Sequence, residues 1–172
     1  MENKEIKKTV YGHYENGLHC AEVISKTILD EFSDKEHPEA VKIASGFGGG
    51  IAGSMEELCG AFTGGIIALS SLVGRENPGE SMKDISILVS EFKEKFLEEF
   101  GSLKCPKLLE EFNKQENPYG CVKLTASASI MLADILNEFE KEKQTDINTI
   151  CCQPKEKVEQ GQCPFNGGGC GC

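Results

Sequence analysis

The chain has 172 residues, a formal net charge of −10 and nine cysteines. A chain of this length fits one domain and buries enough apolar surface to fold without disulfides. The acidic balance excludes a nucleic-acid surface, because neutralising phosphates requires clustered Lys and Arg. The charged N-terminal segment has no apolar stretch of the secretory kind, so we expect a reducing, cytoplasmic location. There, clustered cysteines are more often metal ligands or redox thiols than disulfides.

Apolar residues recur at helical spacing along most of the chain, and no run of strict alternation indicates a sheet. We therefore predict an all-α protein, a single compact helical bundle of about five to six helices. After a polar opening, the expected helices span 17–32, 38–45, 54–73, 80–100, 106–112 and 121–142. Ser54 and Glu57 have the spacing of a capping box. The uncharged run 58–74 is at the lower length limit for a membrane span, and we expect a buried core helix instead.

From about Lys143 the composition changes, with few apolar residues, several helix breakers and five of the nine cysteines. Such a segment cannot pack a core by itself. We therefore divide the chain into a helical domain, 1–142, and a Cys/Gly-rich C-terminal tail, 143–172. The tail's candidate redox or second metal-site residues are Cys151, Cys152, Cys163, Cys170 and Cys172. The last two form a CxC dithiol after a glycine run, and such a pair can exchange disulfides or bind a soft metal.

The other four cysteines come from separate segments, unlike the two close CxxC pairs of a zinc ribbon. They are Cys20, Cys59, Cys105 and Cys121. Three lie in or just before the first turns of expected helices, and Pro106 suggests that Cys105 does so too. Backbone dipoles at such positions favour an anion and lower the pKa of a thiol. Converging thiolates would form an anionic pocket for iron or zinc, whereas the alternative is a set of ordinary buried core cysteines.

Several stretches carry a family resemblance. The central ones are 45–53, which reads SGFGGGIAG, and 57–64, which reads ELCGAFTG. Together with 16–22 upstream and the segments 100–105 and 120–121 downstream, they resemble the redox family named for its C, GCAxxG, C, C pattern. The resemblance covers the greater part of the helical domain and includes all four separate cysteines.

The resemblance implies an all-helical domain related to the cluster-bearing part of split-Soret cytochrome c. In that dimeric protein the equivalent cysteines would hold an iron–sulfur cluster, which implies the same role for the four separate cysteines here. A [2Fe–2S] centre is the first expectation and a [4Fe–4S] centre the second. Gly48, Gly49 and Gly50 would then approach the cluster and donate backbone N–H groups to its sulfurs. The alternative for this loop is a plain interhelix turn. Leu58 and Gly60 depart from the spelling of the family motif around Cys59.

On this basis we expect an iron–sulfur redox protein that acts as an electron carrier or a redox sensor. We also expect it to form a homodimer and to interact with a redox partner protein that the sequence does not identify. No CxxCH site is present, so no haem is expected. Two alternatives stay open: a thiol–disulfide or sulfur-transfer enzyme that uses the tail dithiol, and a soft-metal binding protein. The sequence does not decide whether the protein is an enzyme.

Overall fold

The computed structural model describes residues 3–113 and 120–151, and this part of the chain is all-α, as predicted. Its only strand-like feature is an isolated antiparallel bridge between Leu58 and Lys104. The helices are α1 (Asn3–Glu15), α2 (Cys20–Phe32), α3 (Pro38–Ala44), the short 3-10 helix η1 (Ser45–Phe47), α4 (Gly60–Val73), α5 (Lys83–Phe100), α6 (Cys105–Asn113) and α7 (Gly120–Cys151). Among the described residues, no helix is both long and apolar enough to cross a membrane.

Within residues 3–113 and 120–151 there are seven α-helices, more than the predicted five to six, because α1 forms from the segment that the sequence pattern left as a polar opening. Along α1 only Ile6 and Val10 are buried, and the helix otherwise carries mostly polar and charged side chains. Two buried positions one turn apart are too weak a periodic signal to predict a helix. The half-buried Tyr14 follows Val10 by four residues and packs against the same core.

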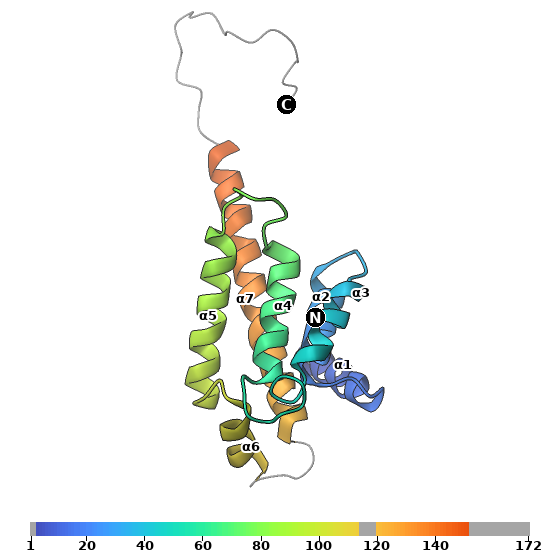
Figure 1. Ribbon diagram of the computed structural model, residues 1–172. Helices are drawn as coiled ribbons and strands as arrows, with labels where there is room; N and C mark the ends of the chain where they lie inside the picture. The colour runs from blue at the N-terminus through green and yellow to red at the C-terminus, as the bar shows by residue number, and fades with distance from the viewer. Residues whose placement is uncertain (1–2, 114–119, 152–172) are drawn as a thin grey trace, which may run out of the picture. The chain divides into compact units, whose positions relative to one another are not determined.

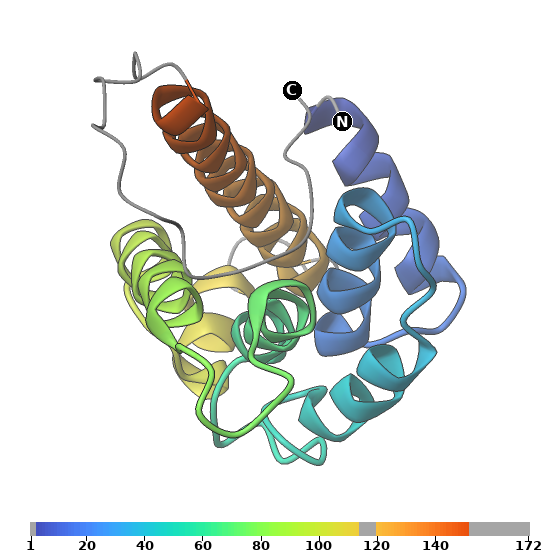
Figure 2. The same ribbon diagram turned by 90° about the horizontal axis from the view of Figure 1, so that it is seen from above.

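Two compact units divide the chain, Met1–Phe139 and Glu140–Cys172. In the first unit, α4 lies between α5 on one side and α2 on the other, as two perpendicular views show (Figures 1 and 2). The helix α7 begins in this unit and ends at Cys151, beyond the predicted end at residue 142. The division of function between residues 1–142 and 143–172 stays a prediction.

The small residues of α4 serve close packing inside the chain. A Cβ atom at Gly64 would clash with the carbonyl oxygen of Ala21 in α2 and would lie 2.7 Å from the Ile24 Cγ2 atom. At the same contact the Ser25 hydroxyl donates a hydrogen bond of 2.8 Å to the Gly64 carbonyl oxygen. The glycine at position 64 therefore serves to bring α2 and α4 together.

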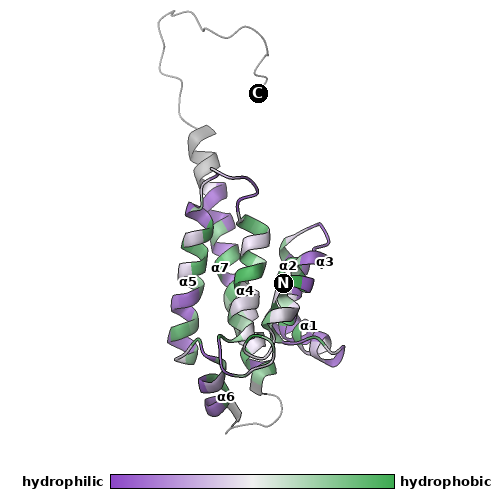
Figure 3. Cartoon of the chain, viewed as in Figure 1, coloured by the Kyte–Doolittle hydropathy of each residue, from purple (hydrophilic) through white to green (hydrophobic). Residues whose placement is uncertain are grey.

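Four phenylalanines pack α4 against α5. Phe62 stacks on Phe92 with ring centroids 5.5 Å apart, and Phe96 meets Phe62 at 5.4 Å. Phe100 continues the row at 4.6 Å from Phe96. Figure 3 shows that apolar residues predominate along α4, whereas α5 also carries hydrophilic residues. Because Phe62 lies in the first turn of α4, this packing fixes the end of the helix that follows Cys59.

Three predicted helix starts are wrong. The expected helix at 54–73 begins only at Gly60, because Ser54 does not cap a helix. Its hydroxyl donates to the Gly50 carbonyl oxygen and accepts from the Glu56 N–H at 3.2 Å, which closes a turn instead. The expected helices at 17–32 and 80–100 each begin three residues later, at Cys20 and Lys83.

Candidate metal centre

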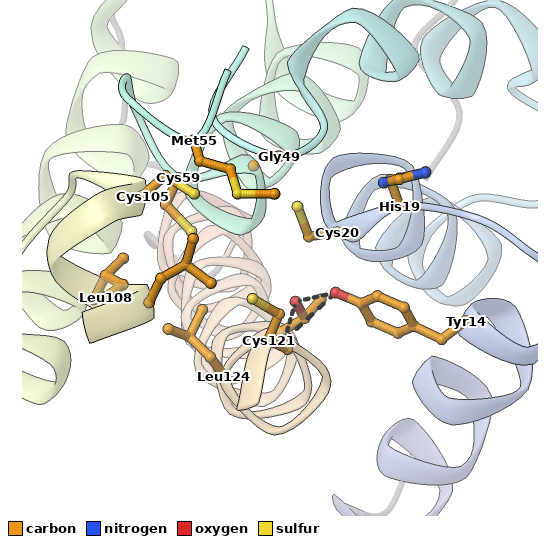
Figure 4. A pocket seen from close by; sticks show the side chains of 13 residues that line it. Tyr14, His19, Cys20, Gly49, Met55, Cys59, Cys105, Leu108, Cys121 and Leu124 are labelled. Carbon is orange, nitrogen blue, oxygen red and sulfur yellow. Dashed lines mark hydrogen bonds between the residues drawn. The ribbon is translucent and has the colours of Figure 1, made fainter. Parts of the chain in front are cut away.

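The four cysteines outside the tail lie at four helix N-termini, as the sequence predicted. Cys20 and Cys105 are the first residues of α2 and α6, Cys59 immediately precedes α4, and Cys121 is the second residue of α7. All four line one cavity of about 150 Å³ (Figure 4), and all are free thiols. The structure therefore brings to one place residues that are far apart in the sequence.

The bridge between Leu58 and Lys104 sets Cys59 beside Cys105. The Cys59 N–H donates to the Leu103 carbonyl oxygen, and the Cys105 N–H donates to the Glu57 carbonyl oxygen, both at 2.8 Å. These reciprocal bonds fix the register of the two segments. As a result, two cysteines that begin different helices share one wall of the cavity.

Two glycines leave room for cysteine side chains. A Cβ atom at Gly60 would clash with the sulfur of Cys20. At Gly50 it would lie 2.8 Å from the Cys105 Cβ atom and 3.3 Å from its sulfur. Gly60, which departs from the spelling of the family motif, thus has a definite role, because it admits the Cys20 thiol.

The predicted glycine loop forms a left-handed turn beside the cavity. Five consecutive residues, Gly49–Gly53, have φ between 52 and 73°, and Met55 has φ of 60°. For the non-glycine residues among them, Ile51 and Ala52 included, this conformation costs about 1–2 kcal/mol each. The Met55 N–H donates to the Gly49 carbonyl oxygen at 2.8 Å, and the Met55 side chain lines the cavity although it is 58% exposed. Met55 therefore lies at the mouth of the cavity.

The three predicted cofactor-binding glycines do not share one environment. Gly49 lines the cavity, and Gly50 lies against Cys105. Gly48 lies against His19 instead, where an added Cβ atom would be 2.9 Å from the His19 Cβ atom. Any contact of these backbone N–H groups with a cofactor stays a prediction.

The rest of the wall is mostly apolar. Leu108 and Leu124 are each 4% exposed. In the described part of the chain the lining includes no Asp, Glu, Lys or Arg. Its polar side chains are those of Tyr14, His19 and Thr125. A charged group in this cavity would therefore depend on helix N-termini and neutral dipoles for stabilisation.

Burial controls the acidity of the thiols. It raises the pKa of Cys59 to about 12, although the N–H of Phe62 acts in the opposite direction, and it raises the pKa of Cys121 to about 11. The pKa of Cys105 is also raised, first by burial and then by a negative charge on Cys20. The expected lowering by helix dipoles is therefore wrong for these three thiols, because desolvation outweighs it. In the metal-free protein they are neutral near pH 7.

The thiols surround the cavity rather than meeting at one point. Among the described residues, no three His, Cys, Asp or Glu side chains are placed to hold one ion. A single Zn²⁺ with Zn–S bonds of about 2.3 Å would need its sulfurs about 3.8 Å apart. A charge on Cys20 nevertheless raises the pKa of each of the other three thiols, so Cys20 is near all of them.

Several lining residues were not predicted from the sequence, and three of them are Tyr14, Thr125 and Met55. Tyr14 lies in the unpredicted helix α1, and its spacing of four from the buried Val10 was the available signal. Thr125 follows Cys121 by one helical turn, which places it on the same side of α7. Met55 gave no signal, because its position depends on the left-handed turn. Of the tail cysteines, Cys151 is the last residue of α7, and the other four lie outside the described residues.

The described residues form a helical fold in which four free thiols line one cavity. These features define a small helical protein with a cysteine-lined site. The chain belongs to the family described as "Putative redox-active protein (C_GCAxxG_C_C)", whose model matches residues 18–135. This match confirms the family predicted from the sequence, and the family description supports a redox role. Comparison with curated proteins and with solved structures found no match.

Proposed function

We propose that the cavity holds an iron–sulfur cluster and that the protein is an electron carrier or a redox sensor. One observation carries the proposal: four thiols from four helix N-termini line the same cavity. Four cysteine thiolates are the common ligand set of iron–sulfur clusters. The cluster ligands would be Cys20, Cys59, Cys105 and Cys121.

The residues present suit such a group. Thiols spread around a cavity match a cluster, whose bridging sulfides set its ligands further apart than the ligands of one ion. The first turns of α2, α4, α6 and α7 direct the positive ends of their backbone dipoles at the anionic thiolates. When bound, the cluster supplies one-electron transfer, and its type is proposed as [2Fe–2S] first and [4Fe–4S] second.

The surrounding residues would orient and shield the site. The Leu58–Lys104 bridge holds the thiols of Cys59 and Cys105 side by side. Leu108 and Leu124 exclude water from the inner wall, and this lowers the local dielectric constant and influences the reduction potential. Binding requires the loss of thiol protons, which the raised pKa values of Cys59 and Cys121 make costly in the absence of a cation.

The thiol-exchange alternative fits the core less well. Nucleophilic cysteines are usually accessible and have a lowered pKa. Here Cys59 and Cys105 are both buried, and the pKa of each is raised. The homodimer stays a prediction, and a mass measurement in solution tests it.

The proposal is tested on full-length protein purified without oxygen. We expect brown protein with iron and acid-labile sulfide in comparable amounts. Cys59→Ser and Cys121→Ser should each bleach the protein. In the matched control, the four cysteines beyond α7 (Cys152, Cys163, Cys170 and Cys172) are changed to Ser together, and colour should remain. Colourless protein that contains only zinc, or colour that is lost only in the control, would overturn the proposal.

A further inference from the structure

Tyr14 reaches from the last turn of α1 into the wall of the cysteine cavity. Its hydroxyl lies 2.8 Å from the Thr125 Oγ1 atom and 3.4 Å from the Cys121 carbonyl oxygen. The Thr125 hydroxyl in turn donates to the Cys121 carbonyl oxygen at 2.7 Å. Figure 4 shows the dashed lines that join Tyr14 to the start of α7 beside Cys121.

The direction of these bonds is assigned from the hydrogens that each hydroxyl carries and from the bond lengths. A threonine hydroxyl has one hydrogen, and that of Thr125 is directed to the Cys121 carbonyl oxygen. The bond from Thr125 to this oxygen is 2.7 Å long and that from Tyr14 is 3.4 Å, so we assign the Tyr14 hydrogen to the closer Thr125 oxygen, where it polarises the bond between Thr125 and Cys121. Thr125 is fully buried, so this relay is shielded from competition by water.

The relay gives Cys121 an anchor of a different kind from those of its neighbours in the cavity. Cys59 and Cys105 are held by the backbone bonds of the Leu58–Lys104 bridge. Cys121 is held by side chains that connect the first turn of α7 to α1, more than one hundred residues away in the sequence. Partners behind the ligands orient metal-binding side chains and tune the bound metal.

We propose that Tyr14 is a positioning residue for the candidate metal centre: through Thr125 it fixes the first turn of α7 and so places the Cys121 thiol at the cavity wall. The effect on a cluster rests on the function proposed above, whereas the placement of Cys121 does not. Because the wall contains no Asp, Glu, Lys or Arg among the described residues, hydroxyl dipoles near the ligands also help to set the reduction potential.

The first test compares Tyr14→Phe with Tyr11→Phe in cluster-loaded protein. Tyr11 is on the same helix but is 37% exposed, and it provides a matched loss of one hydroxyl. We expect Tyr14→Phe to release iron to a chelator about tenfold faster and to lower the reduction potential. Tyr11→Phe should match the unmodified protein in both measurements. Equal behaviour of the two variants would overturn the proposal.

The second test uses metal-free, reduced protein and needs no cluster. Alkylation by iodoacetamide is followed at each cysteine by peptide mass mapping. Tyr14→Phe should accelerate the labelling of Cys121 several-fold and leave Cys59 and Cys105 unchanged. Unchanged labelling of Cys121, or equal acceleration at all three sites, would contradict a positioning role.

Substitutions at Thr125 provide the independent check. Thr125→Val removes the hydroxyl with little change of shape and should accelerate the labelling of Cys121 as Tyr14→Phe does. Thr125→Ser keeps the hydroxyl, so Cys121 should be labelled at the rate found in the unmodified protein. This pair decides the question even if Tyr14→Phe does not fold. If the unmodified protein binds no cluster, the proposed function fails, and the labelling of Cys121 still decides the role of Tyr14.

Discussion

Two regions that line the cysteine cavity differ in how they are stabilised. Where α2 meets α4, small residues allow close packing in relaxed helical conformations, and each helix begins next to a cysteine. In the loop 49–55, by contrast, Ile51, Ala52 and Met55 adopt positive φ, which side chains disfavour. The comparison indicates that rigid helices place the thiols, whereas a strained loop closes over them.

The difference has a physical basis. Helix ends that are locked by core packing hold a side chain accurately, and accuracy is what metal ligands require. Strain persists only where surrounding contacts enforce it, and it is often found at functional sites. The contacts that enforce it here include the hydrogen bonds from the Met55 and Ala52 N–H groups to Gly49 and Gly46.

The largest effect is expected at the contact between α2 and α4, from the substitution Gly64→Ala. The added methyl would meet the Ala21 backbone and would force α2 away from α4. We expect a loss of about 3 kcal/mol in the free energy of unfolding, measured by denaturant titration. The control is Gly12→Ala in α1, where nothing lies within 4 Å, and it should be stabilising by about 0.5–1 kcal/mol. Similar changes for both variants would refute the packing argument.

The next effect is a dependence of stability on pH in the reduced, metal-free protein. Unfolded thiols ionise near pH 9, whereas the folded pKa values are about 12 for Cys59 and about 11 for Cys121. The two buried thiols contribute fully to the free energy of unfolding below about pH 9. This contribution is lost as the pH rises through the pKa values of the folded state, because the unfolded state releases its thiol protons first. Denaturant titrations at several pH values between 7 and 11 test this. Cys59→Ala should reduce the alkaline loss, and an unchanged loss would exclude Cys59 as its source.

A smaller effect is expected from Gly60→Ala, which separates binding from folding. The added methyl would meet the Cys20 thiol, a movable side chain, and would displace it from the cavity; the Phe47 carbonyl oxygen would lie 3.0 Å away, which is a milder contact than the backbone clash at Gly64. We expect iron binding to weaken about tenfold with less destabilisation than for Gly64→Ala. Iron content and unfolding are measured together. Gly46→Ala, at an open position, is the matched control, and equal iron retention in both would count against a role for Cys20.

Periodicity and breakers are local signals, and they predicted the helical class and the helix-terminal places of the four cysteines, whereas the motif resemblance predicted the family. It did not predict the start of α4, since Ser54 closes a turn with Gly50 rather than capping a helix. The Leu58–Lys104 bridge was also missed, because one pair of residues leaves no alternating pattern. Long-range contacts such as that of Tyr14 with Thr125 depend on the packed fold and leave no local pattern.

The smallest effect tests the strained region itself. Ala52→Gly should raise the free energy of unfolding by about 0.5–1 kcal/mol, because glycine accepts positive φ and the exposed methyl of Ala52 contributes little packing. Gly53→Ala is the reverse change at φ of 72°, with nothing within 4 Å of the added methyl, so strain alone should destabilise the protein by about 1 kcal/mol. Opposite signs in denaturant titrations would establish that the turn is under strain. Equal signs would show that the loop relaxes, and the contrast with the α2–α4 contact would then rest on packing alone.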